Sequence, residues 1–389
     1  MKYIYQFAAT AILAGIGNFS HASLTTSSGV QSFSGNASVT ATSTSKTAVS
    51  NTNNNASVAT VSLGQFDTSI GVLTGVELQL KSSRTQTIDG TGFKNNGPGR
   101  TASGSGTSSA LLSTSGFNAA FTPNITQTGS GCGLAMGMTG YISCNWGSQT
   151  SASIVTNITG NVASGNLNDY AGTGLINATL TTPDLAATAT LTATMGQQSG
   201  STVNYSVAWN GSLEAIYSYM LHAAASFDGT STQNSLTLDF GVIPQFGPAP
   251  TLNFDIFNLA DNNRTGLDLD TISGSGDTGA FNIDLTTFSN LAQGTNNNFI
   301  ASMLTSTLGT FSASYLLDLS DTGIGASNTW LNQKLTLNLI GTVNAASTAN
   351  SNPESIPEPG TLALLLAGLG MMAWRLKNQP HEKSGLTIA

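Results

Sequence analysis

Apolar and polar residues alternate along several short stretches of the chain, which is the pattern of half-buried β-strands. Val76, Leu78 and Leu80 alternate with polar residues in "VELQLK", and the same period of two runs through "TLNFDI", "FSASYLLDLSD" and "KLTLNLIGTV". Turns rich in glycine, asparagine and serine separate these stretches. The sequence therefore predicts an all-β protein of two antiparallel β-sandwich modules, flanked by an N-terminal signal peptide and a short C-terminal hydrophobic helix.

The distribution of charge divides the central part of the chain in two. Residues 23–220 carry nearly balanced charge, whereas residues 221–346 hold ten aspartates against Arg264 and Lys334. We therefore predict a β-rich domain over 23–220, an acidic β-rich domain over 221–346 and a polar stalk over 347–356. The glycine- and serine-rich stretch "DGTGFKNNGPGRTASGSGTSS", residues 89–109, predicts a loop insertion in the first domain.

Composition narrows the class of protein. Only 8% of the 389 residues are charged, while 39% are hydrophobic, so hydroxyl and amide groups keep the chain soluble without making it a disordered composition. The net charge of −8 and the lack of clustered lysine and arginine argue against nucleic acid as a partner.

The N-terminus has the features of an export signal. Lys2 precedes a short apolar run, and "SHA" places small residues before a cleavage site between Ala22 and Ser23. Export into an oxidising compartment would let Cys132 and Cys144 form a disulfide.

A second apolar run, "TLALLLAGLGMMAW", lies near the C-terminus with Arg375 and Lys377 behind it. A helix from Thr361 to Trp374 would be about 21 Å long, against a hydrocarbon core of roughly 30 Å. The sequence therefore predicts a marginal membrane anchor, a transmembrane helix lengthened by snorkelling of the two cations.

Pro357, Glu358 and Pro359, followed by this short helix and basic residues, resemble the PEP-CTERM sorting signal of exported bacterial proteins. We predict a sorting segment over residues 357–389, with the helix at about 361–376. The resemblance itself covers about twenty residues, and the tail "NQPHEKSGLTIA" after Lys377 is longer than is usual in the family. The resemblance implies that an exosortase recognises the tripeptide and removes the helix, which holds the protein in the inner membrane until then. It also implies a secreted or cell-surface protein, in bacteria that usually make exopolysaccharide.

The body of the chain has a second resemblance. "ATVSLGQFDTSIGVLTGVELQL" is similar to the start of the choice-of-anchor E domain, and the residues that carry the likeness are Gln65, Phe66, Gly71, Leu73 and Val76. This resemblance implies a β-rich body over 23–220 with no established enzymatic role.

One loop offers candidate metal ligands. Oxygen-bearing side chains gather in "DNNRTGLDLD", at Asp261, Asn263, Thr265, Asp268 and Asp270. Their spacing echoes the opening of a calcium loop, but the EF-hand pattern fails at position twelve, which is Ile272. The loop is either a calcium site or a solvated acidic loop held by Asx-turns.

Catalytic residues are scarce in the sequence. His222 is the one histidine between the two terminal segments, and no nucleophile elbow surrounds a serine. Glycoside hydrolysis needs two paired carboxylates, and the central part offers few glutamates, chiefly Glu77 and Glu214, with Glu77 on the solvent side of a predicted strand. We therefore expect a non-catalytic cell-surface or matrix protein without a cofactor, associated with exopolysaccharide or biofilm. The alternative is an extracellular carbohydrate-active enzyme on a β-sandwich, which requires two facing carboxylates in an aromatic groove.

Overall fold

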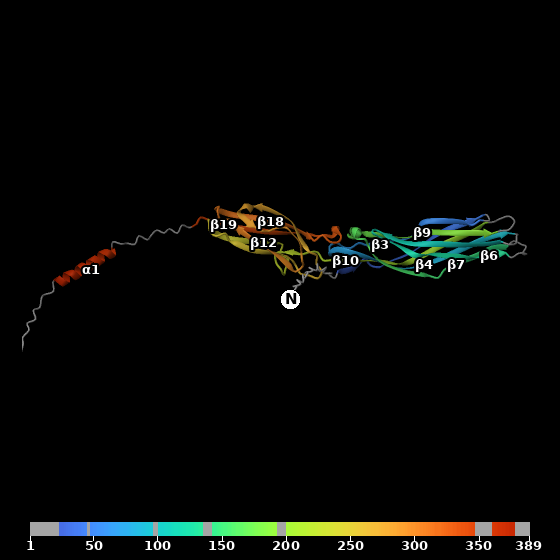
Figure 1. The fold of residues 1–389 in the computed structure, drawn as a ribbon, viewed down its shortest axis with the longest axis horizontal. Coiled ribbons are helices and arrows are strands. Elements are labelled where there is room, and N and C mark those ends of the chain that lie inside the picture. Colours follow the sequence, from blue (N-terminus) through green and yellow to red (C-terminus); the bar gives the residue numbers. More distant parts are fainter. Residues whose placement is uncertain are drawn as a thin grey trace, which may run out of the picture.

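The computed structural model describes residues 23–44, 47–95, 100–134, 142–192, 200–346 and 360–377. The predicted signal peptide, the whole of the predicted stalk and the Pro357–Pro359 tripeptide lie outside these residues. The described body is all-β, as predicted, and its sheets are almost entirely antiparallel. Figure 1 shows two elongated β-bodies placed end to end, with the C-terminal helix separate from both.

The first body, here called module 1, contains two sheets. One sheet has six strands: β1 (Leu24–Ser27), β2 (Gln31–Ser43), β4 (Val72–Asn95), β7 (Ile142–Thr150), β8 (Ile154–Asn161) and β10 (Ser201–Met220). The other has four strands: β3 (Val49–Gly64), β5 (Arg100–Thr114), β6 (Phe117–Leu134) and β9 (Leu175–Thr192). A 3₁₀ turn, η1 (Ser164–Tyr170), joins β8 to β9.

Two long strands give module 1 its length. The 24 residues of β4 extend over about 80 Å at roughly 3.3 Å per residue. Strand β10 pairs with β4 along one edge, and along its other edge it pairs first with β2 and then with β1. Because single long strands tie successive short ones together, the module forms one continuous sandwich.

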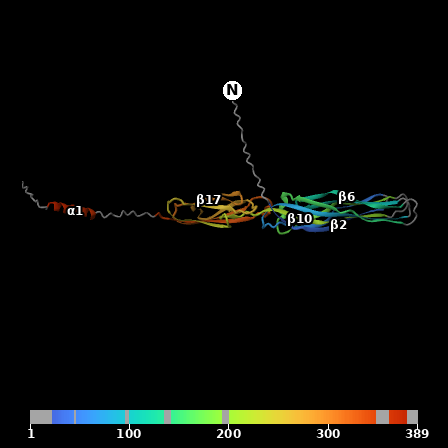
Figure 2. The ribbon, with the colours of Figure 1, turned by 90° about the horizontal axis from the view of Figure 1, so that it is seen from below.

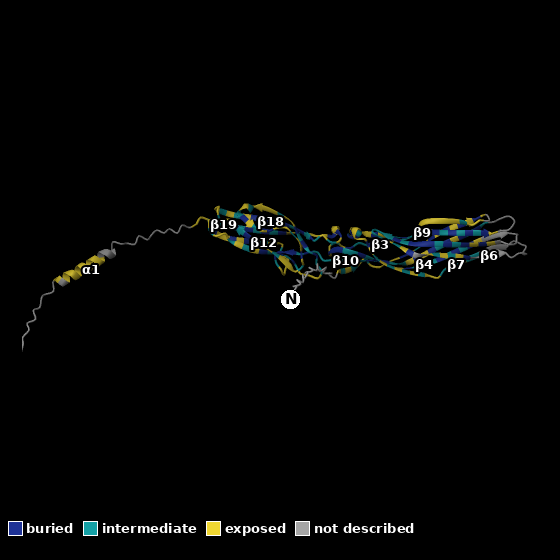
Figure 3. Cartoon of the chain, viewed as in Figure 1, coloured by how far each residue is buried: buried dark blue, intermediate teal, exposed yellow. Residues whose placement is uncertain are grey.

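The two sheets of module 1 face each other across a buried core (Figure 3). Leu78 and Leu80 of β4 and Trp209 of β10 pack in one cluster with Leu112 of β5 and Leu180 of β9. Their alternation along each strand places every second residue on the inner face, which confirms the period of two seen in the sequence.

The prediction of a loop over residues 89–109 is wrong. Strand β4 continues to Asn95 and β5 begins at Arg100, so most of this glycine-rich stretch is strand. Its glycines leave room for large side chains. A Cβ atom on Gly106 would lie 2.1 Å from the ring of Tyr205, and one on Gly90 would lie 1.6 Å from the indole of Trp146. Glycine at these two positions therefore allows the Tyr205 and Trp146 side chains to pack against the strands.

Module 2 also contains two sheets. One has strands β11 (Ala225–Ser226), β13 (Thr251–Asn258), β15 (Phe281–Ile283) and β17 (Thr295–Met303). The other has β12 (Ser235–Pro244), β14 (Leu267–Gly276), β16 (Phe288–Leu291), β18 (Gly309–Asp321) and β19 (Asn332–Asn344). Short 3₁₀ turns, η2 (Thr278–Ala280) and η3 (Ser327–Thr329), complete it.

The predicted strands "TLNFDI", "FSASYLLDLSD" and "KLTLNLIGTV" correspond to β13, β18 and β19. One pairing differs from the antiparallel prediction, because β12 runs parallel to β19. After β11 the chain crosses to the other sheet. There it adds β12 at the edge beside β19, and the two strands run in the same direction.

The modules have separate cores. Buried apolar residues of 223–343 form one cluster, and those of module 1 form two others that include a single residue of module 2, Ala326. Strand β10 ends at Met220 and the second body begins directly after it. Figure 2 shows the same end-to-end arrangement after a quarter turn.

The C-terminal helix α1 (Gly360–Lys377) corresponds to the helix predicted at about 361–376. Its apolar side chains are exposed on all sides, including Leu364, Leu366 and Trp374. No helix within the described residues is long and apolar enough to cross a membrane. Arg375 and Lys377 occupy the last turn of α1.

Candidate functional site

The most elaborate polar arrangement in the described residues lies where the two modules meet. The segment between β18 and β19, residues 322–331, extends from module 2 onto the end of module 1. Ala326 is buried in the core of module 1, and its N–H donates to the carbonyl oxygen of Leu73 over 2.8 Å. In return, the Leu73 N–H donates to Oγ1 of Thr329 over 3.2 Å. The segment thus acts as a plug that is paired with the start of β4.

Amide side chains strengthen this contact beside the plug. Nδ2 of Asn328 donates to the Asn168 carbonyl oxygen over 2.9 Å, and Oδ1 of Asn168 accepts the Asn328 N–H over 3.2 Å. Asn168 lies in η1 and Asn328 in η3, so two short helical turns are joined across the boundary.

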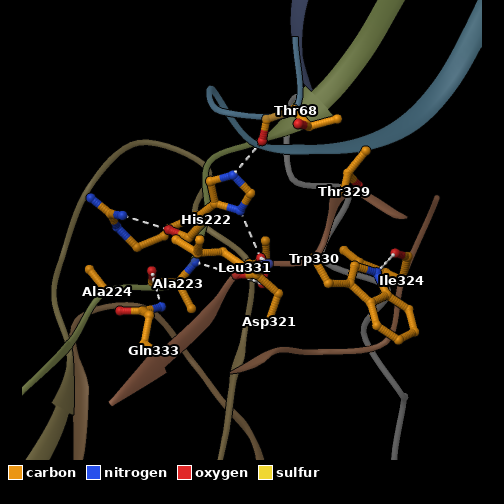
Figure 4. A network of polar contacts seen from close by, with 12 residues as sticks. Thr68, His222, Ala223, Ala224, Asp321, Ile324, Thr329, Trp330, Leu331 and Gln333 are labelled. Atoms are coloured by element: carbon orange, nitrogen blue, oxygen red, sulfur yellow. Dashed lines mark hydrogen bonds and ion pairs between the residues drawn. The ribbon is translucent and has the colours of Figure 1, made fainter. Parts of the chain in front are cut away.

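His222 and Asp321 form a partly buried ion pair at the centre of the junction (Figure 4). Nδ1 of His222 lies 2.7 Å from Oδ2 of Asp321, and Nε2 lies 2.9 Å from the carbonyl oxygen of Thr68 in module 1. The side chain of Asp321 is fully buried. His222 therefore connects a carboxylate of module 2 to the backbone of module 1.

The carboxylate of Asp321 is surrounded by hydrogen-bond donors. Besides His222, Asp321 accepts hydrogen bonds from the backbone N–H groups of Ala223 and Leu331, each over 2.7 Å, and a longer one from Oγ1 of Thr265. Both oxygens face donors, which suits a carboxylate that only accepts.

The same geometry favours a charged imidazole. Both ring nitrogens of His222 face oxygen acceptors, so both donate in the protonated form. Burial lowers the pKa of His222 and is the largest single effect, but hydrogen bonds to Asp321 and Thr68 together raise the pKa above its ordinary value. Neither nitrogen is left to accept a proton from a serine, so the pair is arranged for holding the junction.

The predicted calcium ligands do not converge. Asp261 forms an ion pair with Arg264, with 2.7 Å between Oδ2 and Nη2. Oδ1 of Asp268 accepts from the Asn290 N–H and from the Thr322 hydroxyl. Thr265 is buried beside Asp321, whereas Asp270 is exposed.

Asn263, the remaining predicted ligand, adopts a left-handed backbone conformation with φ of 57°. In the described part of the chain, no three histidine, cysteine or acidic residues are grouped so that they could hold a metal ion. Calcium binding stays a prediction, to be checked by the melting temperature in millimolar calcium.

Glu77 and Glu214 lie on the outer face of module 1. Glu77 is opposite Ile216, and Glu214 is opposite Gln79, so the two glutamates are diagonal neighbours on β4 and β10. Each accepts a hydrogen bond, Glu77 from Gln79 and Glu214 from Ser27. Among the described residues, the hollow beside Glu77 is lined by this one carboxylate and by no aromatic ring.

The residues that carry the likeness to the choice-of-anchor E domain lie at the end of module 1 that meets module 2. Phe66, Leu73 and Val76 are buried in its core. The side chain of Gln65 bonds to the backbone of Asp169 and Gly174, and a Cβ on Gly71 would lie 2.1 Å from the Met220 carbonyl oxygen. These residues thus build the surface on which the plug docks.

The remaining predicted sites belong to the termini and to the cysteines. Ser23 is exposed at the start of the described chain, and Ala22 lies outside the described residues. The backbones of Cys132 and Cys144 belong to β6 and β7, strands of the two facing sheets. Their side chains lie outside the described residues, so the disulfide stays a prediction.

The helix α1 is preceded by the Pro357, Glu358 and Pro359 tripeptide and ends in Arg375 and Lys377. Residues 355–377 match the PEP-CTERM protein-sorting motif. The motif implies an exported, cell-surface protein that is processed by an exosortase. The resemblance to choice-of-anchor E is not confirmed.

Comparisons of the whole chain add little to this motif. No curated protein matches the chain. Among solved structures, the Vibrio cholerae VesB protease is 14% identical over 34% of this chain and 37% of that one, with a TM-score of 0.22. The PapD-like domain 7 of human CEP192 is 11% identical over 32% of this chain and 87% of that one, with a TM-score of 0.21.

A C. elegans member of the MSP family is 7% identical over 26% of this chain and 91% of that one, with a TM-score of 0.19. At such TM-scores, none of these likenesses supports a fold or a function for this chain.

Proposed function

We propose that this protein is an exported, non-catalytic component of the cell surface or extracellular matrix, held briefly at the inner membrane and released when an exosortase removes its C-terminal segment. The observation that carries the proposal is the match of residues 355–377 to the sorting motif. The motif follows a body that is complete in its own cores, so removal of the segment leaves both modules intact.

The exposure of α1 supports a temporary role for the helix. Its leucines and methionines from Leu364 to Met372 are more than half exposed, and no part of the described body covers them. An apolar helix open on all sides is unfavourable in water, because each buried methylene would contribute roughly 0.8 kcal/mol. The helix therefore needs lipid or an enzyme groove before cleavage, and its loss makes the mature protein more soluble.

The outer faces of the sheets support a structural role in a hydrated matrix. Hydroxyl and amide side chains pair across neighbouring strands, as in Thr40 with Asn204 and Thr310 with Thr342. Such faces are polar without being charged, which suits contact with hydrated exopolysaccharide in a biofilm. The enzyme alternative has less support, because the hollow at Glu77 lacks both a second carboxylate and an aromatic wall.

The test compares cells with and without the exosortase, using a tag inserted in the stalk before Pro357. The expected result is a smaller tagged protein outside the inner membrane in the wild type and a full-mass protein held at the membrane in the deletion strain. Equal mass and location in the two strains would refute the proposal.

The chain offers a matched control for the motif. Replacing Pro357 and Glu358 by alanine should block processing, whereas the same change at Pro353 and Glu354, outside the matched residues, should not. Association with polymer is then measured by co-sedimentation of the processed protein with purified exopolysaccharide from the same cells.

A further inference from the structure

The inward-facing side chains of β4 change from apolar to polar halfway along module 1. Leu78 and Leu80 face the core, but the next inward positions are Ser82, Arg84 and Gln86 before Ile88 restores the apolar pattern. Arg84 is 2% exposed and Gln86 is fully buried. This polar belt lies between the two apolar clusters of the module, one containing Leu80 and the other Ile88.

Arg84 has aromatic neighbours and no anionic one. Its guanidinium carbon lies 5.3 Å from the ring centre of Phe121 and 5.9 Å from that of Trp209. Within the described chain, no carboxylate forms an ion pair with it, and Nε and Nη1 have no hydrogen-bond partner. Burial lowers the pKa of Arg84, which reflects a cation without a counter-charge.

Other unpartnered donors accompany Arg84 in the belt. Trp209 lies directly opposite Arg84 in the pairing of β10 with β4, and its buried Nε1 has no acceptor. Nε2 of Gln86 also has none, while its Oε1 accepts the Tyr205 hydroxyl over 2.6 Å. On the facing sheet, Oγ1 of Thr182 is buried and unpartnered.

The chemistry of this group calls for an acceptor with negative charge. Arginine does not lose its proton in proteins, and a buried cation costs several kcal/mol unless it is paired. A cation–π contact recovers about 2 kcal/mol when desolvated, which leaves part of that cost. Water could accept the hydrogen bonds but would not neutralise the charge.

We propose that the core of module 1 binds a small monovalent inorganic anion, of the size and charge of chloride, against Arg84, Gln86 and Trp209. The unpartnered nitrogen atoms of the three side chains are all N–H donors, which is the kind of group that an anion accepts from. Arg84, Gln86 and Trp209 are all buried, which excludes larger ligands such as carbohydrate.

The test measures the thermal midpoint of the full-length protein in sodium chloride and in sodium gluconate at equal ionic strength. Unfolding releases a bound anion to the solution, so the midpoint responds to bulk chloride even if exchange in the folded state is slow. At a hundredfold excess over the dissociation constant, the midpoint should rise by about 5–10 °C.

Two variants of β4 separate the site from general salt effects. Arg84→Met removes the buried cation, so the difference between chloride and gluconate should disappear. Lys81→Met, on the exposed face of the same strand, should retain the difference. A midpoint of the natural protein that is the same in both salts would overturn the proposal.

If Arg84→Met does not fold, crystallography of the natural protein tests the anion site directly. Crystals of the natural protein grown in bromide should show an anomalous peak within about 3.5 Å of Nε or Nη1 of Arg84. Density for water alone at that position, with no anomalous signal, would overturn the proposal.

Discussion

Replacing Asp321 by asparagine tests whether the partly buried ion pair holds the two modules together. The carboxylate accepts four hydrogen bonds, from His222, Ala223, Leu331 and Thr265. Asparagine keeps one acceptor oxygen and presents an amide donor in place of the other. The variant retains the shape of the side chain, so its cost reports charge and hydrogen bonding rather than a cavity.

The expected loss in the free energy of unfolding follows from the hydrogen-bonding groups that lose their partners. If the amide nitrogen replaces Oδ2, the Leu331 N–H faces a donor, and a buried unpaired N–H costs about 1–3 kcal/mol. His222 can relieve its own mismatch by losing its proton and accepting from the amide through Nδ1. The charge-assisted bond is then lost, so we expect about 3 kcal/mol in total, at the low end of the range for broken buried pairs.

The assay is urea unfolding of the full-length protein, monitored by circular dichroism and tryptophan fluorescence. With a slope of about 1–3 kcal/mol per molar urea, the transition that includes module 2 should shift by about 1 M or more. Asp261→Asn is the matched control, since the Asp261–Arg264 pair is partly exposed and should contribute less than about 1 kcal/mol. A shift for Asp321→Asn no larger than for the control would refute the role of the pair.

Three further predictions concern other parts of the molecule. Because the folded-state pKa of His222 is raised, the stability from its ion pair is complete below the unfolded-state pKa of about 6.5 and is lost as pH rises through the folded-state pKa. Urea midpoints of the natural protein should therefore fall with rising pH in that window, while His222→Gln should show no such fall. Gly106→Val should destabilise module 1 by at least about 1–3 kcal/mol, because its side chain would occupy the space of the Tyr205 ring; an unchanged urea midpoint would contradict the packing argument. Cys132 and Cys144 should resist alkylation unless reduced, and replacing both with serine should cost roughly 3 kcal/mol in thermal or urea unfolding; two thiols that react without reduction would disprove the disulfide.

The sequence alone was sufficient for features that depend on near neighbours in the chain. Alternation of apolar and polar residues predicted β13, β18 and β19, because the side chains of a strand alternate between its two faces wherever the strand lies. The sorting motif is likewise a contiguous segment, so its tripeptide, helix and basic residues could be recognised without a fold.

The tertiary structure decided everything that depends on which distant segments meet. His222 is 154 residues from Thr68 and 99 residues from Asp321 in the sequence, and no local pattern predicts either contact. In the acidic loop, Asp261 pairs with the nearby Arg264, whereas Asp268 accepts from Asn290 and Thr322, two residues that are distant in the sequence. Side-chain pairing across a sandwich is set by the registers of both sheets, and local periodicity fixes neither register.

The glycine-rich stretch over 89–109 shows the same limit in backbone terms. Its composition is typical of turns, yet glycine is also tolerated in a strand where a facing side chain needs the space of a missing Cβ. Tyr205 and Trp146 supply those side chains, and both belong to strands far away in the sequence. Only the tertiary structure, which pairs β7 with β4 and packs β10 against β5, could reveal that these glycines are part of a core.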